Sequence, residues 1–250
     1  MGVDKKMQKS VAMVMPGGGM RCAYSAGATV ALAREFGLCE PGMILASSGS
    51  VGTMFYFLAR QYDAIERIWT KHLATRRFVS LLRVRKIMDI DWLVDEVFRR
   101  IDPLDIRAVN DSSTDWRVPV TDKVKKNVRF VSKEDGVDVF ELMRAAKAAP
   151  FIYGKSVILD GIEYIDGDLS RPLGTVTPLL QRSISKVISL ETVVARSGKE
   201  MIESGRILVR ICPSRKYLTR ISVGKAPLAR AFEAGYMDCA SNSAIRRMLE

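Results

Sequence analysis

The stretch SVAMVMPGGGMRCAYSAGATVALAREF, residues 10–36, decides the fold. Its first part, Ser10–Met15, is a short apolar run that ends at Pro-Gly-Gly-Gly, a pattern typical of a buried strand followed by a loop. Its last part, Arg21–Phe36, places alanines, Val30 and Leu32 at helical spacing. The stretch therefore predicts a strand, a glycine-rich turn and a helix in direct succession.

The same alternation continues along the chain. Apolar runs predict further strands at residues 43–46, 116–121, 128–132, 164–165, 186–193 and 206–211, and helices at 52–62, 64–101 and 139–146. Strands that alternate with helices predict an α/β fold, a three-layer α/β/α arrangement with a mainly parallel central sheet. Because no repeat, low-complexity tract or linker interrupts the pattern, we expect a single domain over residues 1–250.

Composition excludes several classes of protein. A hydrophobic content of 48% and a charged content of 27% over 250 residues exclude disordered and fibrous chains. The 39 basic and 28 acidic residues give a net charge of +11, which favours an anionic partner: nucleic acid, a membrane surface or a phosphorylated substrate. The four cysteines, at positions 22, 39, 212 and 239, form no C-x-x-C pair, so we expect neither a zinc site nor a disulfide framework, and a reducing compartment.

Targeting signals are not expected in this sequence. Pro16 and the glycines after it end the first apolar stretch too early for a signal peptide, and Lys6 departs from the myristoylation pattern. The longest uncharged run, residues 41–59, contains too many glycines and serines to span a membrane well. We therefore expect a cytoplasmic protein whose membrane contact, if any, is peripheral.

Two features follow predicted strands, at the sheet edge where α/β proteins usually place their sites. The first is Gly17-Gly18-Gly19-Met20-Arg21, whose glycines allow backbone N–H groups to turn toward an anion at a helix N-terminus. It matches neither the G-x-G-x-x-G dinucleotide pattern nor the G-K-[ST] of a P-loop. Such a loop binds a phosphate, holds an oxyanion or forms a plain tight turn.

The second feature is Ala46-Ser47-Ser48-Gly49-Ser50-Val51-Gly52, again between a strand and a helix. It has the form of a nucleophile elbow, in which small residues two positions on either side of a serine let strand and helix approach closely. Ser48 and Ser50 both have such neighbours. A third feature, Tyr164-Ile165-Asp166-Gly167-Asp168, sets Asp166 at the end of an apolar strand, although Asp-Gly also marks ordinary hairpin turns.

In this order, the three features resemble the patatin-like phospholipase family, over about residues 10 to 240. The resemblance rests on the G-G-G-x-R loop of Gly17 to Arg21, the serine turn about thirty residues later and Asp166-Gly167. It also includes A-A-P-F at 148–151 and the helix Ala231–Tyr236. It implies a lipid acyl hydrolase with a serine-aspartate dyad, an oxyanion hole formed by Gly17, Gly18, Gly19 and Arg21, and no metal or organic cofactor.

The serine turn, A-S-S-G-S, is closer to the G-x-S-G-S of the related cytosolic phospholipases A2 than to G-x-S-x-G. We favour Ser48 as the nucleophile, because the strand before it then reaches its serine at the family's usual distance, and keep Ser50 as the alternative. In the aspartate motif, Asp168 replaces the family's small residue, a change expected to alter the pocket near the catalytic carboxylate.

The histidine count supports a dyad independently. A Ser-acid-His triad of the α/β-hydrolase order needs a histidine after residue 166, and the sole histidine is His72. Asp166 must then act as the general base. We expect His72 to be a surface or packing residue.

Basic residues cluster at Arg76-Arg77, at Arg83 to Lys86, at Lys123, Lys125 and Lys126, and at Arg215-Lys216. They are either solvated faces or a surface that docks on anionic lipid, with Phe78–Arg83 as an interfacial helix. Nucleic acid is disfavoured because no stacking platform accompanies the charge, and nothing in the sequence indicates an oligomeric state. Two rivals to the hydrolase remain: a catalytically weak patatin-fold protein that binds lipid or membrane, and a phosphate- or nucleotide-binding α/β protein.

Overall fold

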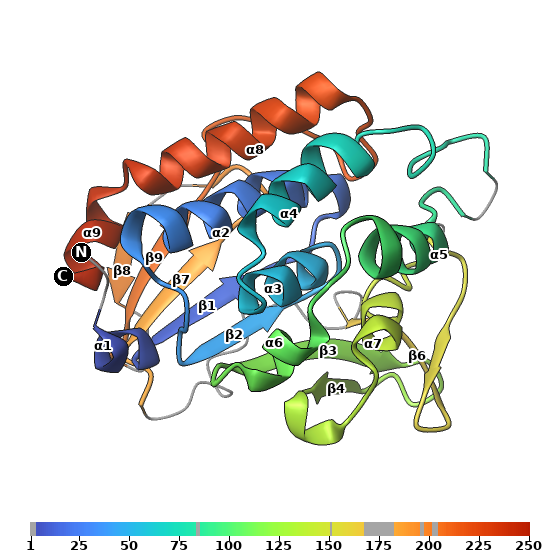
Figure 1. Cartoon of the computed structure of the whole chain (residues 1–250), viewed down its shortest axis with the longest axis horizontal. Coiled ribbons are helices and arrows are strands. Elements are labelled where there is room, and N and C mark those ends of the chain that lie inside the picture. Colours follow the sequence, from blue (N-terminus) through green and yellow to red (C-terminus); the bar gives the residue numbers. More distant parts are fainter. Residues whose placement is uncertain (1–3, 84–85, 151, 168–182, 196–197, 202–204) are drawn as a thin grey trace.

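A mixed sheet forms the centre of the molecule (Figure 1). The computed structural model describes residues 4–83, 86–150, 152–167, 183–195, 198–201 and 205–250. The strands in these residues are β1 Val11–Met15, β2 Met43–Ala46, β3 Asp115–Asp122, β4 Val128–Val131, β5 Val157–Leu159, β6 Ile162–Asp166, β7 Lys186–Leu190, β8 Gly198–Met201 and β9 Ile207–Ile211. Their spatial order is β5-β6-β3-β2-β1-β7-β9-β8, and β4 also pairs with β3.

The centre of this sheet is parallel and both of its edges are antiparallel. Strands β3, β2, β1, β7 and β9 pair in parallel, whereas β4 and β6 join β3, and β8 joins β9, in antiparallel fashion. Parallel neighbours bring their carboxyl ends to one edge of a sheet. The predicted α/β fold with a mainly parallel central sheet is confirmed, and the parallel strands fix the edge at which the candidate site lies.

The central strands are apolar on both faces. Along β1, Val11, Met13 and Met15 join the main core, while Ala12 and Val14 join a smaller cluster on the opposite face. Because successive strand side chains point to opposite faces, only a strand buried on both sides needs such an unbroken apolar run. This explains why SVAMVM predicts a central strand.

The helices vary in length and in type. The α-helices are α1 Lys5–Lys9, α2 Cys22–Phe36, α3 Ser50–Leu58, α4 Tyr62–Arg67, α5 Ile90–Trp92, α6 Ile106–Asp111, α7 Val139–Ala145, α8 Lys225–Ala240 and α9 Ser243–Leu249. Wider π-helical segments continue two of them, η2 Ile68–His72 after α4 and η3 Leu93–Ile101 after α5, and short 3-10 turns lie at η1 Gly19–Arg21 and η4 Lys133–Asp135.

Helices α2 and α8 pack together on one face of the sheet, with α2 between α8 and the strands (Figure 1). Two glycines permit this contact. A Cβ atom at Gly27 would lie 1.9 Å from the carbonyl oxygen of Phe232, and one at Gly235 would lie 1.9 Å from that of Tyr24. Any side chain at either position would push the helices apart, so these glycines are required by backbone approach.

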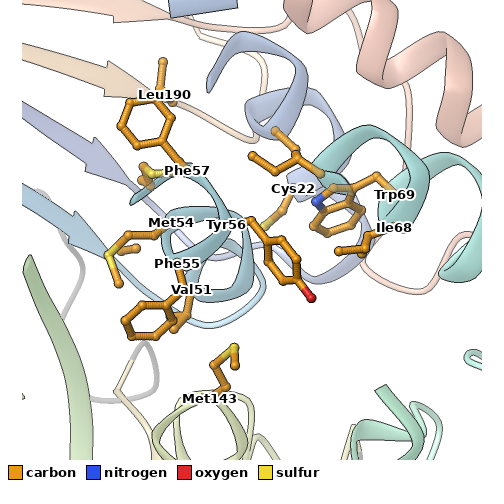
Figure 2. Close-up of a cluster of buried hydrophobic side chains, with 14 of the residues drawn as sticks. Cys22, Val51, Met54, Phe55, Tyr56, Phe57, Ile68, Trp69, Met143 and Leu190 are labelled. Carbon is orange, nitrogen blue, oxygen red and sulfur yellow. The ribbon is translucent and has the colours of Figure 1, made fainter. Parts of the chain in front are cut away.

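Helix α3 is buried on all sides. Figure 2 shows Val51, Met54, Phe55, Tyr56 and Phe57 pointing from it in several directions into the core. A helix that is apolar all round must lie inside the protein. This burial holds the turn at its N-terminus, which contains the candidate serines, in a fixed position.

The predicted run of helices over residues 64–101 is only partly correct. Residues 73–83 and 86–89 form turns and a β-bridge between Val79 and Met88, and they separate η2 from α5. The predicted interfacial helix at Phe78–Arg83 is therefore absent: Phe78 and Val79 are buried, and Leu81 and Leu82 are exposed. Helical periodicity failed here because the apolar residues serve an irregular segment that packs onto the core and lines a cavity.

Candidate active site

The glycine loop, residues 17–21, leaves β1 beside the serine turn, residues 47–50, which leaves β2. Register puts Met15 opposite Ala46, and the Ser47 amide donates to the Met15 carbonyl at 3.1 Å. Neither Gly18 nor Gly19 has room for a side chain: a Cβ at Gly18 would lie 2.6 Å from the Thr192 hydroxyl oxygen, and one at Gly19 would lie 2.5 Å from the Arg220 carbonyl oxygen. Gly19 also has a left-handed backbone, φ +59°.

The serines of the turn occupy three different environments. Ser47 is buried, and its hydroxyl oxygen accepts the Gly17 amide proton at 2.9 Å. Ser50 is buried too, and its hydroxyl donates to the Pro16 carbonyl at 2.8 Å. Ser48 is half-buried and lines a cavity. Ser47 and Ser50 thus fasten the serine turn to the glycine loop, while Ser48 faces the cavity.

Ser48 also has an unusual backbone. Its φ of +47° lies in the left-handed region, which a residue with a Cβ enters only at an energetic cost. Backbone strain of this kind concentrates at functional sites, and a strained strand-to-helix turn is the mark of a nucleophile elbow. Ser50, by contrast, is the first residue of helix α3.

Asp166 reaches the same cavity from β6. Pairing with β3 sets Asp166 opposite Val120, and its amide donates to the Ala148 carbonyl at 3.4 Å. Only 2% of the residue is exposed. The antiparallel edge of the sheet therefore turns this carboxylate back toward the loops that follow β1 and β2.

The cavity that joins these groups has a volume of about 120 Å³, and we call it the apolar cavity. Its polar lining includes Ser48, Asp166 and the backbone of Gly18 and Gly19. Its remaining wall is mainly apolar: Trp69, Leu73, Phe78, Met88, Ile90, Leu93 and Ile152. A few polar groups within an apolar wall are typical of a site that takes a mostly hydrocarbon ligand.

Lys147 lines the apolar cavity as well, although the sequence analysis gave it no role. It follows α7, is 6% exposed, and donates to the Met143 carbonyl at 3.4 Å. Burial lowers the pKa of Lys147 to about 8, against the opposing effect of the Asp166 and Cys22 charges. A lysine among alanines, in A-A-K-A-A, was the signal that could have revealed a charge inside the protein.

His72 has a different partner. Its Nε2 lies 2.8 Å from the Asp102 carboxylate, which also accepts from Arg67. Burial raises the pKa of Asp102, but hydrogen bonds from Arg67 and His72 outweigh it and hold the pKa below its usual value. His72 does not line the apolar cavity, so the structure does not bring it together with Ser48 or Asp166.

Other predicted site residues are placed as follows. The Gly17 amide is already engaged by Ser47, whereas Gly18 and Gly19 line the cavity. Arg21 donates through Nε to the Gly18 carbonyl at 3.3 Å and lines a second cavity, described below. Asp168 lies outside the described residues.

The basic clusters contain two kinds of residue: some form ion pairs within the protein, and others are exposed. Arg83 and Lys86 pair with Asp89, and Lys123 pairs with Glu163, whereas Arg76, Arg77, Arg215 and Lys216 are exposed. Part of the predicted basic surface therefore stabilises the fold, and the remainder is available to bind an anion.

The chain is an α/β protein with a mostly parallel central sheet, and its glycine-rich loop and serine turn lie together at one edge of that sheet. The particular family follows from comparison: the chain belongs to the patatin-like phospholipase family, whose model matches residues 13–177. This membership confirms the resemblance found in the sequence and supports, at the level of the family, hydrolysis of lipid acyl esters.

Two known proteins are similar to the chain. Escherichia coli (strain K12) YjjU, itself uncharacterized, is 24% identical over 218 residues, which cover 84% of this chain and 54% of YjjU. The chain thus spans about half the length of that relative. The crystal structure of VipD from Legionella pneumophila has a TM-score of 0.61 at 11% identity, over 96% of this chain and 67% of VipD, and shows the shared fold. Among the described residues, no helix is long and apolar enough to cross a membrane.

Proposed function

We propose that the chain hydrolyses acyl esters of lipids, with Ser48 as the nucleophile and Asp166 as the general base. One observation carries the proposal: Ser48, strained at the turn after β2, lines the same apolar-walled cavity as Asp166 and the glycine loop. A nucleophile, a base and oxyanion donors around one space are the parts that acyl transfer requires. Family membership supports the same reaction class.

In the proposed first half-reaction, the acyl chain occupies the apolar cavity and the ester carbonyl lies near Ser48. Asp166 accepts the Ser48 hydroxyl proton as the serine oxygen bonds to the carbonyl carbon. The amides of Gly18 and Gly19 stabilise the negative charge on the carbonyl oxygen. The ester C–O bond then breaks, and the alcohol leaves with the proton from Asp166.

In the second half-reaction, Asp166 accepts a proton from a water molecule, whose oxygen attacks the acyl carbon. The bond to Ser48 breaks, the serine regains a proton from Asp166 and the fatty acid is released. Arg21 has a supporting role in this scheme: its guanidinium holds the Gly18 carbonyl and so orients the loop. His72, bound to Asp102, takes no part.

The two rivals are a catalytically weak lipid-binding patatin fold and a phosphate- or nucleotide-binding protein. Both explain a cavity and a glycine loop. Neither requires a serine in a left-handed conformation, a backbone strain that costs of order 1–3 kcal/mol, in a cavity that a buried carboxylate also lines. The strain at Ser48 is therefore the observation that favours the hydrolase.

A fluorophosphonate probe tests the proposal, because it bonds only to an activated serine. We expect labelling, and peptide mapping should locate it at Ser48. Asp166→Asn should reduce both labelling and p-nitrophenyl butyrate hydrolysis by about 10³-fold or more, whereas the control His72→Ala should retain most of both.

Circular dichroism must show each variant folded. Loss of activity in folded His72→Ala would contradict the dyad, and labelling at Ser50 would contradict the choice of nucleophile. A folded wild-type protein that neither labels nor hydrolyses the ester would favour the lipid-binding rival.

We further propose that the substrate is taken from an anionic membrane surface. Leu81 and Leu82, with 68% and 94% of their surface exposed, lie between Phe78 and Met88 in the sequence, and both of these residues line the apolar cavity. The exposed Arg76 and Arg77 lie close by in sequence. Exposed leucines beside arginines combine apolar insertion with attraction to anionic headgroups.

A further inference from the structure

A second cavity of about 360 Å³ is lined in part by Arg21 of the glycine loop, and we call it the basic cavity. The loop contributes to both spaces: Gly18, Gly19 and Met20 line the apolar cavity, and Arg21 lines the basic one. Arg220 lines both. The two cavities are therefore neighbours across one short piece of backbone.

Backbone contacts fix the wall of the basic cavity to the glycine loop. The Met20 amide donates to the Arg220 carbonyl at 3.0 Å, and Thr192, another lining residue, donates through its hydroxyl to the Gly17 carbonyl at 3.0 Å. A group bound in the basic cavity is thus held in a constant position relative to the loop that faces Ser48.

The charge of the basic cavity has one sign. Four cationic side chains line it, from Arg21, Arg215, Lys216 and Arg220, and no carboxylate does so among the described residues. Within the same part of the chain, neither Arg215, Lys216 nor Arg220 forms an ion pair. The guanidinium groups of Arg215 and Arg220, which pair with no carboxylate in the residues that the structure describes, match the oxygens of a phosphate, which such groups bind with paired hydrogen bonds.

The aromatic lining argues against a cationic headgroup. Tyr217 and Tyr24 are the rings of the cavity, stacked with their centroids 6.2 Å apart. The Arg215 guanidinium already lies 5.0 Å from the centre of the Tyr217 ring. A choline group would compete with Arg215 for that ring and would meet four like charges.

We propose that the basic cavity binds the phosphate of an ester whose alcohol portion is anionic, so that the enzyme prefers lysophosphatidic acid and similar anionic lipids over neutral glycerides and choline lipids. This inference rests on the proposed acyl hydrolase. The apolar cavity takes the acyl chain, the basic cavity takes the phosphate, and the ester lies at the glycine loop between them. Arg215 and Lys216 then determine specificity without touching the reacting atoms.

The test compares three esters with one acyl chain: lysophosphatidic acid, monoacylglycerol and lysophosphatidylcholine. For wild-type protein we expect the highest kcat/KM with lysophosphatidic acid. The double variant Arg215→Gln/Lys216→Gln should lose about tenfold or more on that substrate, mainly through KM, and should stay within about twofold on monoacylglycerol. The control Arg107→Gln/Lys125→Gln removes the same charge from exposed positions elsewhere and should behave as wild type.

A binding experiment, which we call the binding arm of the test, separates this inference from the proposed hydrolase. Glycerol 3-phosphate should bind to the Ser48→Ala protein in calorimetry at low salt, and should not bind when Arg215→Gln and Lys216→Gln are added. If wild-type protein hydrolyses none of the esters, the proposed function fails while this arm still decides whether the anion site exists. Absence of binding, or an equal loss in the Arg107→Gln/Lys125→Gln control, would overturn the anion site.

Inorganic phosphate distinguishes a lipid headgroup from a free anion. At a headgroup subsite, phosphate should raise the KM for lysophosphatidic acid and leave monoacylglycerol hydrolysis unchanged. If phosphate alters the hydrolysis of both esters equally, the cavity binds a free effector and the headgroup assignment is wrong.

Discussion

The two cavities beside the glycine loop differ in where they keep their charges. In the apolar cavity, Lys147 and Asp166 are 6% and 2% exposed and lie close enough for the charge of Asp166 to affect the lysine. In the basic cavity, Arg215, Lys216 and Arg220 are open to solvent. Buried charges are costly and act strongly on neighbouring groups, whereas exposed charges attract ligands at little cost to the fold. The difference suggests a chemical role for the first cavity and a recognition role for the second.

The largest effect that we expect lies in the apolar cavity, at its two candidate serines. Ser48→Ala should lower esterase activity by about 10³-fold or more, because it removes the proposed nucleophile. Ser50→Gly should stay within about tenfold of wild type, since it removes only the hydrogen bond to the Pro16 carbonyl. Ester hydrolysis and probe labelling of both variants measure this.

If Ser48→Ala still labels and Ser50→Gly does not, the nucleophile lies two residues further along. The assignment of chemistry to the residue that faces the apolar cavity would then be wrong.

A smaller effect concerns the free energy of unfolding. It compares the buried Lys147 with the exposed Lys216. Burial lowers the pKa of Lys147 to about 8 in the folded protein, from the 10.5 of a solvent-exposed lysine. Between these values the unfolded state binds more protons, so this group makes folding more favourable as pH rises. Relative to Lys147→Met, wild-type protein should therefore gain about 2 kcal/mol of unfolding free energy between pH 8 and 9.5.

Urea unfolding at both pH values measures the gain. Lys216→Met is the matched control from the basic cavity, and its pH dependence should follow wild type. Parallel pH dependence of wild type and Lys147→Met would show that Lys147 titrates normally and that the two cavities do not differ in this respect.

The smallest effect concerns which cavity faces the membrane. Replacing Leu81 and Leu82 together by glutamate should weaken binding to anionic vesicles by about tenfold, because two exposed apolar side chains no longer insert. The matched change of Val193 and Val194, which line the basic cavity and are 44% and 54% exposed, should have less effect. Vesicle sedimentation compares the two variants.

Binding should also fall as salt rises past about 0.15 M, where the Debye length is roughly 8 Å. Equal sedimentation of wild-type protein with neutral and anionic vesicles would contradict the electrostatic part of this proposal. A larger loss in the valine variant would place the basic cavity at the membrane instead.

The parts of the molecule that the sequence predicted are those determined by local pattern. An apolar run followed by three glycines predicts β1 and its loop, and Asp166 is recognisable because a strand ends on it. The distinction between Ser48 and Ser50 could not be drawn in this way. It depends on which serine hydroxyl donates a hydrogen bond to the Pro16 carbonyl. That serine is Ser50, and Pro16 lies 34 residues before it in the sequence.

The missed features depend on distant contacts. Lys147 is an ordinary residue in the sequence, and its lowered pKa arises only when strands and loops from elsewhere remove it from water. In the sequence, Arg215 and Lys216 are typical of an ordinary solvated face. Their place beside the glycine loop depends on the hydrogen bond from the Met20 amide to the Arg220 carbonyl, which the sequence pattern does not reveal. Leu73, Phe78 and Met88 are apolar because they line a cavity, which no helical period reveals.

The close crossing of α2 and α8 has a consequence for how the protein is made. Helix α2 begins directly after the glycine loop, and Gly27 and Gly235 bring its backbone against α8, which is synthesised about two hundred residues later. A nascent chain that has not yet released α8 from the ribosome lacks both this support and the Arg220 carbonyl. The glycine loop therefore reaches its final form only after Arg220 and helix α8 have left the ribosome, so its folding follows that of the strands before it.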